Sequence, residues 1–427
     1  MYIALLGRQP HLGIAELERV YGSSHVSWFG AHAAAIESES FALERLGGSL
    51  KAGRVVAEAT GDWRKLSQKL VRHYEQQWSG VEGKLTLGIS AYGFHVSPRD
   101  VQKTGIVLKQ RLKQRGVSVR LVPNDDVALS TATSHHNKLG RSANKVELLV
   151  VSDGHKTLIA ESVGVQNISA YAARDQGRPK RDAFVGMLPP KLAQIIVNLA
   201  APSRVESAPS RVSTEHLQPE SDQTSGLLSD AARSRSGADT SGKAIGTPVL
   251  LDPFCGTGVI LQEALLAGYA VYGTDLADKM IDYSGVNIDW IKQKARLDAP
   301  VTLHQGDAMT TSWQQPIDIV ACESYLGQPF SAPPSPAKLR EVRGNCDHII
   351  SKFLRNIGSQ LTPGTPLCVA VPAWRDASGR FTHLPLIDSL DTLGYSRVAF
   401  TNVKDSDLLY YREDQVVARE LLVLVKK

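Results

Sequence analysis

Residues 249–260 hold the pattern with the clearest chemical meaning in this chain. An apolar run at 249–251 predicts a buried strand, and a turn rich in small residues follows it at 253–258. A second apolar run, at 259–267, has the length of a helix. Open α/β sheets bind nucleotide-like ligands where a strand, a turn and a helix succeed one another in this way. Gly256 and Gly258 carry no Cβ, so the backbone can approach such a ligand closely.

The spacing of these glycines is not that of dinucleotide enzymes, and no Gly-Lys-Ser/Thr follows to hold phosphates. A structural turn in some other α/β protein is the alternative interpretation. The string Asp-Pro-Phe-Cys-Gly-Thr-Gly resembles the first motif of S-adenosylmethionine-dependent methyltransferases that modify RNA or exocyclic amines. This resemblance implies S-adenosylmethionine as the cofactor. It assigns cofactor contacts to Asp252, Phe254, Cys255, Gly256, Thr257 and Gly258.

Three aspartates each follow a predicted strand, namely Asp252, Asp275 and Asp307. Parallel strands of a doubly wound sheet end at one edge, so we expect these carboxylates to lie together there. Asp275 suits the two ribose hydroxyls of the cofactor, and Asp307 suits its adenine amino group. The next residues in the chain, Leu276 and Ala308, are predicted to line the same site. Taken singly, each aspartate has an alternative interpretation as a turn residue or a helix cap.

Glu323 and Tyr325 follow the fourth predicted strand and are the candidate catalytic residues. The lone pair of an exocyclic amine is delocalised into its base and must be turned toward an incoming methyl group. A carboxylate and a backbone carbonyl that accept the two N–H bonds can do this, while an aromatic ring stacks on the base. The alternative is a strand end that carries a surface glutamate and a core tyrosine.

Strands and helices alternate from residue 247 to residue 427, which predicts a doubly wound sheet. The predicted strands are 249–251, 270–274, 301–303, 317–321 and 366–371, with a final antiparallel strand at 417–425. The predicted helices are 260–267, 279–294 and 338–357. The expected fold class is therefore α/β, with a mostly parallel, Rossmann-like methyltransferase sheet preceded by an α+β region.

The front half of the chain mixes short strands and helices and is basic. A short helix is predicted at 41–46, a longer one at 98–115 and a strand at 127–133. Residues 1–200 hold 26 Lys and Arg against 17 Asp and Glu. Six of these basic residues lie within 101–120, a stretch that contains no Asp or Glu. Such a run suits a polyanion such as RNA, although a solvated helix face is the alternative. The candidate RNA-binding residues are Lys103, Lys109, Arg111, Lys113 and Arg115.

Composition narrows the class of protein further. No apolar stretch reaches the roughly 18 residues of a membrane span, so we expect no membrane partner. The four cysteines lie far apart without a Cys-x-x-Cys pair, which argues against a zinc site and against disulfides. We therefore predict no metal and a cytoplasmic location. The Ser-rich segment 201–247 is predicted to be a disordered linker.

Beyond its first motif, the chain resembles the THUMP-domain RNA methyltransferases, specifically the group that makes N2-methylguanosine at position 10 of tRNA. The similar segments are 6–18, 46–51, 84–162, 174–193 with Phe184 and Met187, and the tail at 410–420. The resemblance implies tRNA or another structured RNA as the substrate, and it leaves room for a small activator subunit. The implied regions are an N-terminal module (1–80), a THUMP-like RNA-binding domain (81–165), a connector beside the cofactor pocket (166–200), the linker (201–247) and the methyltransferase domain (248–427).

The chain departs from this family at its catalytic motif. The family has Asp-Pro-Pro-Tyr or Asn-Pro-Pro-Tyr, whereas Glu-Ser-Tyr-Leu-Gly stands here at 323–327. The acid is one methylene longer, both prolines are absent and the aromatic residue has moved by one place. We interpret this as a variant active site for guanosine N2. The alternatives are a methyltransferase for adenine N6 in RNA or DNA, and an RNA-binding protein with a vestigial cofactor fold.

Overall fold

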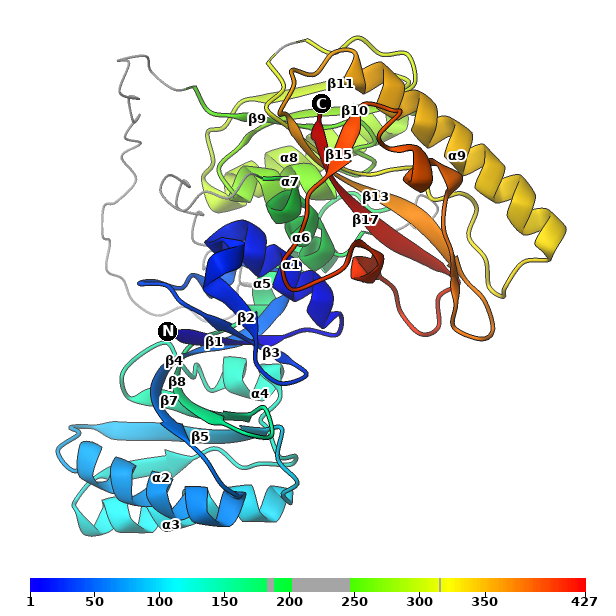
Figure 1. Cartoon of the computed structure of the whole chain (residues 1–427). Coiled ribbons are helices and arrows are strands. Elements are labelled where there is room, and N and C mark those ends of the chain that lie inside the picture. The colour runs from blue at the N-terminus through cyan, green and yellow to red at the C-terminus, as the bar shows by residue number, and fades with distance from the viewer. Residues whose placement is uncertain (183–187, 202–245, 315) are drawn as a thin grey trace. The chain divides into compact units, whose positions relative to one another are not determined.

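The computed structural model describes residues 1–182, 188–201, 246–314 and 316–427 (Figure 1). These residues form two compact units. Unit 1 contains Met1–Ile168 and Ala399–Leu408, and unit 2 contains the other described residues. No helix of the described residues is long and apolar enough to cross a membrane. Phe184, Met187 and most of the predicted linker, at 202–245, lie outside the described residues.

Unit 1 is built on one eight-stranded sheet with the order β2-β3-β1-β4-β8-β7-β5-β6. The strands are β1 (Tyr2–Leu6), β2 (Val26–Trp28), β3 (Ala33–Ile36), β4 (Ser49–Ala59), β5 (Lys84–Tyr92), β6 (Ser118–Leu121), β7 (Lys145–Ser152) and β8 (Thr157–Val165). Neighbouring strands are antiparallel, except that β5 pairs in parallel with β6 and β7. Because β4 pairs with both β1 and β8, a single sheet serves the two regions that the sequence places at 1–80 and 81–165.

The helices of this unit are α1 (Pro10–Tyr21), α2 (Trp63–Gln77), α3 (Pro98–Gln114), α4 (Thr131–His136) and the start of α5 (Ile168–Gln176). Sequence signals account for α3 directly. Ser97 caps it by accepting a hydrogen bond from the Asp100 amide at 3.2 Å, and Pro98 occupies its first turn. The apolar face of α3 is buried together with α2 in one core cluster on the sheet. The basic residues between these apolar positions are thereby left on the outer side.

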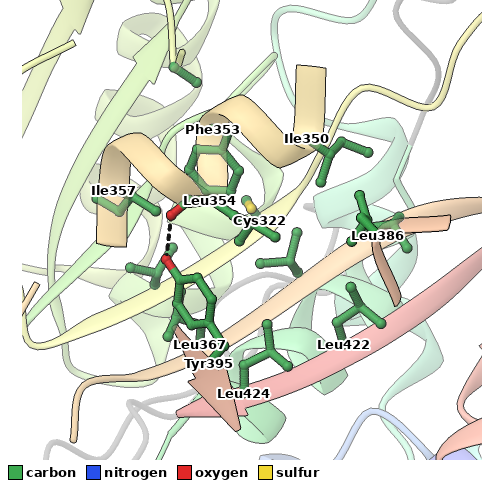
Figure 2. Packing of buried hydrophobic residues seen from close by; sticks show 14 of the residues in the cluster. Cys322, Ile350, Phe353, Leu354, Ile357, Leu367, Leu386, Tyr395, Leu422 and Leu424 are labelled. Atoms are coloured by element: carbon green, nitrogen blue, oxygen red, sulfur yellow. Dashed lines mark hydrogen bonds between the residues drawn. The ribbon is translucent and has the colours of Figure 1, made fainter. Parts of the chain in front are cut away.

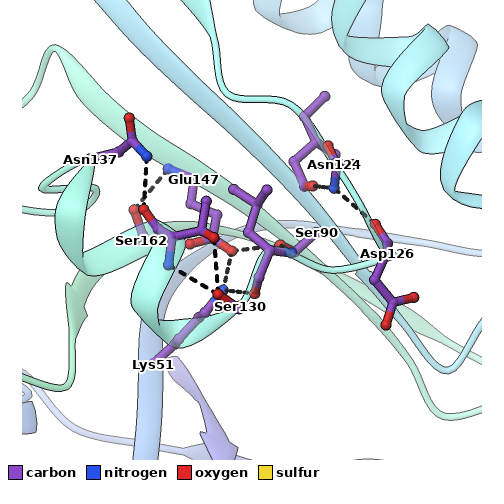
Figure 3. A network of polar contacts seen from close by, with 11 residues as sticks. Lys51, Ser90, Asn124, Asp126, Ser130, Asn137, Glu147 and Ser162 are labelled. Carbon is purple, nitrogen blue, oxygen red and sulfur yellow. Dashed lines mark hydrogen bonds and ion pairs between the residues drawn. The ribbon is translucent and has the colours of Figure 1, made fainter. Parts of the chain in front are cut away.

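A buried polar network overturns the strand predicted at 127–133 (Figure 3). Lys51 Nζ donates to Glu147 Oε1 at 2.5 Å and to the Leu129 carbonyl at 2.6 Å. Ser90 Oγ donates to the same glutamate oxygen and accepts from the Leu129 amide. Ser130 then caps α4 through the Thr133 amide. Side chains therefore bind the backbone at Leu129 and at the start of α4. One backbone hydrogen bond to β5, from the Ala91 amide to the Val127 carbonyl at 2.9 Å, is not extended into a strand. The helix predicted at 41–46 is also shorter, a single 3₁₀ turn at Leu43–Arg45.

Unit 2 contains a second, nine-stranded sheet, whose main path has the order β11-β10-β9-β12-β13-β17-β15. Its strands are β9 (Val249–Asp252), β10 (Ala270–Asp275), β11 (Val301–Gln305), β12 (Ile319–Glu323), β13 (Pro366–Arg375), β14 (Phe381–Thr382), β15 (Tyr395–Arg397), β16 (Leu409–Tyr410) and β17 (Val417–Lys426). The strands from β11 to β13 pair in parallel, and β17 is antiparallel to β13. The chain passes from β9 to β10 and β11 on one side, and then returns to β12 on the other. The order of the strands therefore reverses between β9 and β12, where such sheets bind ligands.

Helices α6 (Pro190–Ala200), α7 (Val259–Leu266), α8 (Asp278–Ala295) and α9 (Pro336–Gly358) accompany this sheet. Figure 2 shows the apolar face of α9 over the strands β13, β15 and β17. Ile350, Phe353, Leu354 and Ile357 are fully buried there. Tyr395 joins the two layers, since its hydroxyl donates to the Leu354 carbonyl at 2.6 Å. This packing fixes α9 relative to the strand ends that form the candidate site.

Candidate active site

A cavity of about 540 Å³ lies in unit 2 at the carboxyl ends of β9, β10 and β12. Its position is the one that the sequence predicts, at the reversal of strand order. Apart from Gly258, every residue predicted for the cofactor or for catalysis lines it. The other lining residues, which were not among the candidate site residues, are Leu188, Pro253, Val259, Ile260, Met309, Ser324, Leu326, Gly327, Asn345 and Ile349.

Two side chains of helix α8 hold the motif turn at 253–258 by hydrogen bonds to its backbone carbonyls. Ser284 Oγ donates to the Gly256 carbonyl at 2.9 Å, and Asn287 Nδ2 donates to the Thr257 carbonyl at 2.8 Å. Gly258 has φ +80°, and a Cβ there would lie 3.0 Å from Ser284 Oγ. Glycine is therefore required by the turn itself, so Gly258 shapes the cavity without lining it.

Asp275 ends β10 and is bound to the motif turn. Its Oδ2 accepts from the Gly256 amide at 2.9 Å, and its Oδ1 accepts from the Ala277 amide at 3.0 Å. Each carboxylate oxygen can accept more than one hydrogen bond, so the ribose diol of a ligand still finds an acceptor here. The neighbouring Leu276 is 68% exposed and lines the cavity, where it offers an apolar contact.

Asp252 is the most deeply buried acid of the cavity, at 1% exposure. Burial raises the pKa of its carboxyl group well above the usual range, and the nearby charges of Asp275 and Glu323 raise it further. A single backbone hydrogen bond, from the Phe254 amide at 3.1 Å, opposes this. A negative charge at Asp252 is therefore costly unless a positive charge enters the cavity.

Asp307 follows strand β11 in the chain. Its Oδ1 accepts from the Met309 amide at 2.9 Å, so it has the turn-capping role that was the alternative interpretation. It also lines the cavity with Ala308, as a ligand-binding residue would. In total four carboxylates line this cavity, and none of its described lining residues is Lys or Arg. Such a lining favours a cationic ligand.

Glu323, at the end of β12, forms an ion pair that the sequence did not reveal. Arg419 Nε of β17 donates to Glu323 Oε1 at 2.6 Å, and both side chains are largely buried. Next to Glu323, Ser324 donates to the Ala370 carbonyl through its hydroxyl at 2.8 Å and its amide at 2.9 Å. The pair with Arg419 occupies one carboxylate oxygen, Oε1. No hydrogen bond to the other oxygen, Glu323 Oε2, occurs among the described residues, and Glu323 lines the cavity.

Tyr325 is 42% exposed at the rim of the cavity, so its ring is accessible for stacking. The loop after it packs on α9, because a Cβ at Gly327 would lie 2.9 Å from Val342 Cγ1. Helix α9 also brings the polar side chain of Asn345 to the cavity. No sequence pattern points to Asn345, since α9 begins well after the fourth strand and its alignment depends on the core of unit 2.

The predicted RNA-binding residues lie along α3 in unit 1, away from the apolar face. Lys103 and Arg111 line a groove of about 1180 Å³ between α2 and α3, to which α2 adds Arg64 and Arg72. Two of the five predicted bases are partly neutralised, because Arg111 and Arg115 both pair with Glu75, at 2.9 Å and 3.3 Å. Arg111 lowers the pKa of this carboxyl group. The sequence did not reveal this partner on α2.

The chain was compared with known proteins by sequence and by structure. No family model matches the chain. Over 127 residues, 30% of the chain, it is 28% identical to the tRNA (guanine(10)-N2)-dimethyltransferase of Methanothermobacter thermautotrophicus. This match spans about a third of that curated relative, 34% of its length. The crystal structure of TrmN from Thermus thermophilus superposes with a TM-score of 0.52 over 100% of this chain and 99% of that chain, at 17% identity.

At this identity the TrmN match establishes the fold alone. The predicted fold class is confirmed: a Rossmann-like, mostly parallel sheet with an antiparallel C-terminal strand, preceded by an α+β region. No group of His, Cys, Asp and Glu that could hold a metal ion occurs among the residues that the structure describes.

Proposed function

We propose that this protein is an S-adenosylmethionine-dependent methyltransferase that methylates the N2 amine of guanosine in tRNA. The observation that carries the proposal is the cavity at the sheet's reversal point, which joins the motif turn to four carboxylates. A cavity of about 540 Å³ has room for a nucleoside-sized ligand. S-adenosylmethionine fits its charge, because the cofactor carries a sulfonium and an ammonium group.

Each part of the cofactor has an assigned residue in this proposal. Asp275 accepts hydrogen bonds from the ribose hydroxyls, and Asp307 accepts one from the adenine amino group. Leu276 and Ala308 contact the faces of the adenine. The positively charged end of the cofactor lies near the buried Asp252. Burial and the neighbouring carboxylates disfavour the ionised form of Asp252, and a positive charge beside it favours that form. When bound, the cofactor supplies an activated methyl group.

Glu323 orients the amine that receives this methyl group. Its Oε1 is occupied by Arg419, so Oε2 accepts a hydrogen bond from one N–H of the amine. That contact turns the nitrogen lone pair toward the methyl group. Tyr325, exposed at the rim, stacks on the target base after the base leaves its helix. Ser324 stabilises the loop in place of the family's prolines through its two hydrogen bonds to the Ala370 carbonyl.

RNA, and specifically tRNA, is proposed as the substrate on two grounds. One is the short similarity to the tRNA (guanine(10)-N2)-dimethyltransferase. The other is the basic outer face of α3, with Lys103, Lys109 and Lys113 outside the Glu75 pairs. The four cysteines are free thiols in the structure, and we propose the reducing cytoplasm as the compartment.

The test is transfer of a labelled methyl group from S-adenosylmethionine by the purified full chain. The acceptors are total tRNA, ribosomal RNA and double-stranded DNA. We expect label in tRNA alone. Label in DNA would support the adenine N6 alternative, and cofactor binding without transfer to any acceptor would support an RNA-binding protein. Transfer that requires added cell extract would indicate an activator subunit.

A further inference from the structure

Arg178 carries a buried guanidinium that has no hydrogen-bond partner among the residues that the structure describes. It is 3% exposed, and its Nε, Nη1 and Nη2 atoms are all buried without a hydrogen bond. No ion pair with it occurs among the described residues either. Arg174, four residues earlier on α5, shows the usual arrangement: its Nε donates to Glu263 Oε1 at 2.5 Å, and its guanidinium lies 4.5 Å from the centre of the Tyr171 ring.

An unpaired guanidinium in such a position needs a ligand. Arginine carries five N–H donors and stays charged, so its burial without acceptors is costly. Burial lowers the pKa of Arg178, and the neighbouring Asp175 only partly opposes this effect. A planar set of donors of this kind matches the oxygens of a phosphate or a carboxylate.

Contacts to helix α8 hold the segment that carries Arg178 close to the candidate active site. The Lys180 amide donates to Asn287 Oδ1 at 2.9 Å, and Asn287 Nδ2 donates to the Lys180 carbonyl at 2.9 Å. The same Asn287 amide group donates to the Thr257 carbonyl at 2.8 Å. Thr257 belongs to the motif turn and lines the cavity. Arg178 is therefore two residues from Lys180, whose backbone is linked through Asn287 to the motif turn. We call these contacts among Lys180, Asn287 and Thr257 the clamp.

Further positive charge surrounds this clamp. Lys180 Nζ lies 5.4 Å and Lys279 Nζ lies 5.1 Å from the centre of the Tyr283 ring. Lys279 is paired with Asp182 at 2.8 Å, whereas Lys180 forms no ion pair among the described residues. The cavity itself has the opposite sign, because its lining carries four carboxylates. A polyanionic substrate would be repelled by that lining unless cations bind its backbone beside the cavity.

We propose that Arg178, with Lys180 beside it, binds a backbone phosphate of the substrate RNA close to the nucleotide that enters the cavity. This inference rests on the proposed function. It adds an RNA contact on unit 2 to the contacts proposed for the basic side chains of α3. Arg178 provides a charge-assisted, fork-shaped contact, and Lys180 provides additional positive charge. The site positions the RNA strand rather than reading its sequence.

The test compares Arg178→Met with the wild-type chain and with Arg355→Met, the same change at an exposed arginine of α9. Filter binding of tRNA at several salt concentrations gives the affinity and its salt dependence, and calorimetry gives the affinity for S-adenosylmethionine. Melting curves in sodium phosphate and in sodium chloride of equal ionic strength report oxyanion binding without RNA. Because Arg178→Met removes an unpaired buried charge, we expect it to fold and to melt no lower than the wild type.

We expect phosphate to raise the melting temperature of the wild type and of Arg355→Met but not of Arg178→Met. Arg178→Met should weaken tRNA binding about tenfold and reduce the log–log salt slope by about one, with cofactor affinity unchanged. Unchanged tRNA affinity and slope would overturn the proposal. Loss of cofactor affinity instead would overturn it in favour of the cofactor's carboxylate as the ligand. If the wild type bound no RNA, the proposed function would fail, and the phosphate melting curves would still show whether Arg178 binds an oxyanion.

Discussion

Replacement of Glu323 by Gln is the substitution whose effect the structure specifies most closely. Arg419 Nε donates to Glu323 Oε1 at 2.6 Å in a largely buried position. A glutamine here must still present an oxygen to Arg419, because a guanidinium can only donate. Its NH2 group then takes the place of Oε2. The substrate amine would therefore meet a donor where the wild type has an acceptor.

The size of the effect follows from that exchange. A hydrogen bond to a charged group contributes about 1.5–3 kcal/mol, and about 1.4 kcal/mol corresponds to a tenfold change in rate. Loss of the contact alone predicts a decrease of about 10- to 100-fold. The replacement also places the NH2 group of glutamine opposite an N–H of the substrate amine, so that two donors face each other. We therefore expect the single-turnover rate to fall about 100-fold or more, the scale of losing one transition-state contact. Affinity for S-adenosylmethionine and tRNA should change little, since the contact matters mainly as the methyl group moves.

The assay is single-turnover methyl transfer to tRNA with saturating protein and labelled cofactor. Glu341→Gln is the matched control, because Glu341 lies on α9 in an exposed pair with Lys338. That variant should retain the wild-type rate. A wild-type rate for Glu323→Gln would refute the orienting role of Glu323. An equal loss of cofactor affinity would instead show that Glu323 belongs to the cofactor site.

Three further variants test the roles of Asp275, of Asp252 and of the basic face of α3. Asp275→Ala should weaken S-adenosylmethionine binding at least tenfold by calorimetry, and unchanged affinity would remove Asp275 from the site. Asp252 has a raised pKa in the folded protein, so its ionisation opposes folding once the pH exceeds its unfolded value. Asp252→Asn should therefore raise the melting temperature of the ligand-free protein at pH 7. The expected rise is about 2–4 °C for each kcal/mol gained in the free energy of unfolding. The gain should vanish near pH 4, and a gain that persists there would contradict this reasoning. Joint replacement of Lys109, Arg111, Lys113 and Arg115 by Ala should weaken tRNA binding and flatten its salt dependence, mostly through the two lysines, since the arginines already pair with Glu75. An unaltered salt slope would show that α3 is only a solvated face.

The sequence predicted the parts of the site that local patterns encode. Asp252, Asp275 and Asp307 each end or follow a strand, and parallel strands that end at one edge necessarily bring such residues together. Arg419 and Asn345 were missed because their chain positions are distant from the motif. Only the pairing of β17 with β13 and the packing of α9 bring them to it.

The wrong prediction at 127–133 has a related cause. Its alternating apolar residues favour a strand, but the buried Lys51 and Ser90 bind the backbone of Leu129. Tertiary contacts of this kind override local β propensity. Arg178 is a second residue whose contacts the sequence could not predict. Its arginine-rich surroundings are visible in the sequence, whereas its burial without a partner is visible only in the structure.

We propose that guanosine N2 of tRNA is methylated in this cavity. The most direct measurement is mass spectrometry of nucleosides from tRNA incubated with the purified chain and deuterium-labelled S-adenosylmethionine. We expect labelled N2-methylguanosine, formed about 100-fold or more slowly when Glu323→Gln replaces the wild type. Labelled N6-methyladenosine, or no labelled nucleoside from any tRNA pool although the cofactor binds, would contradict it.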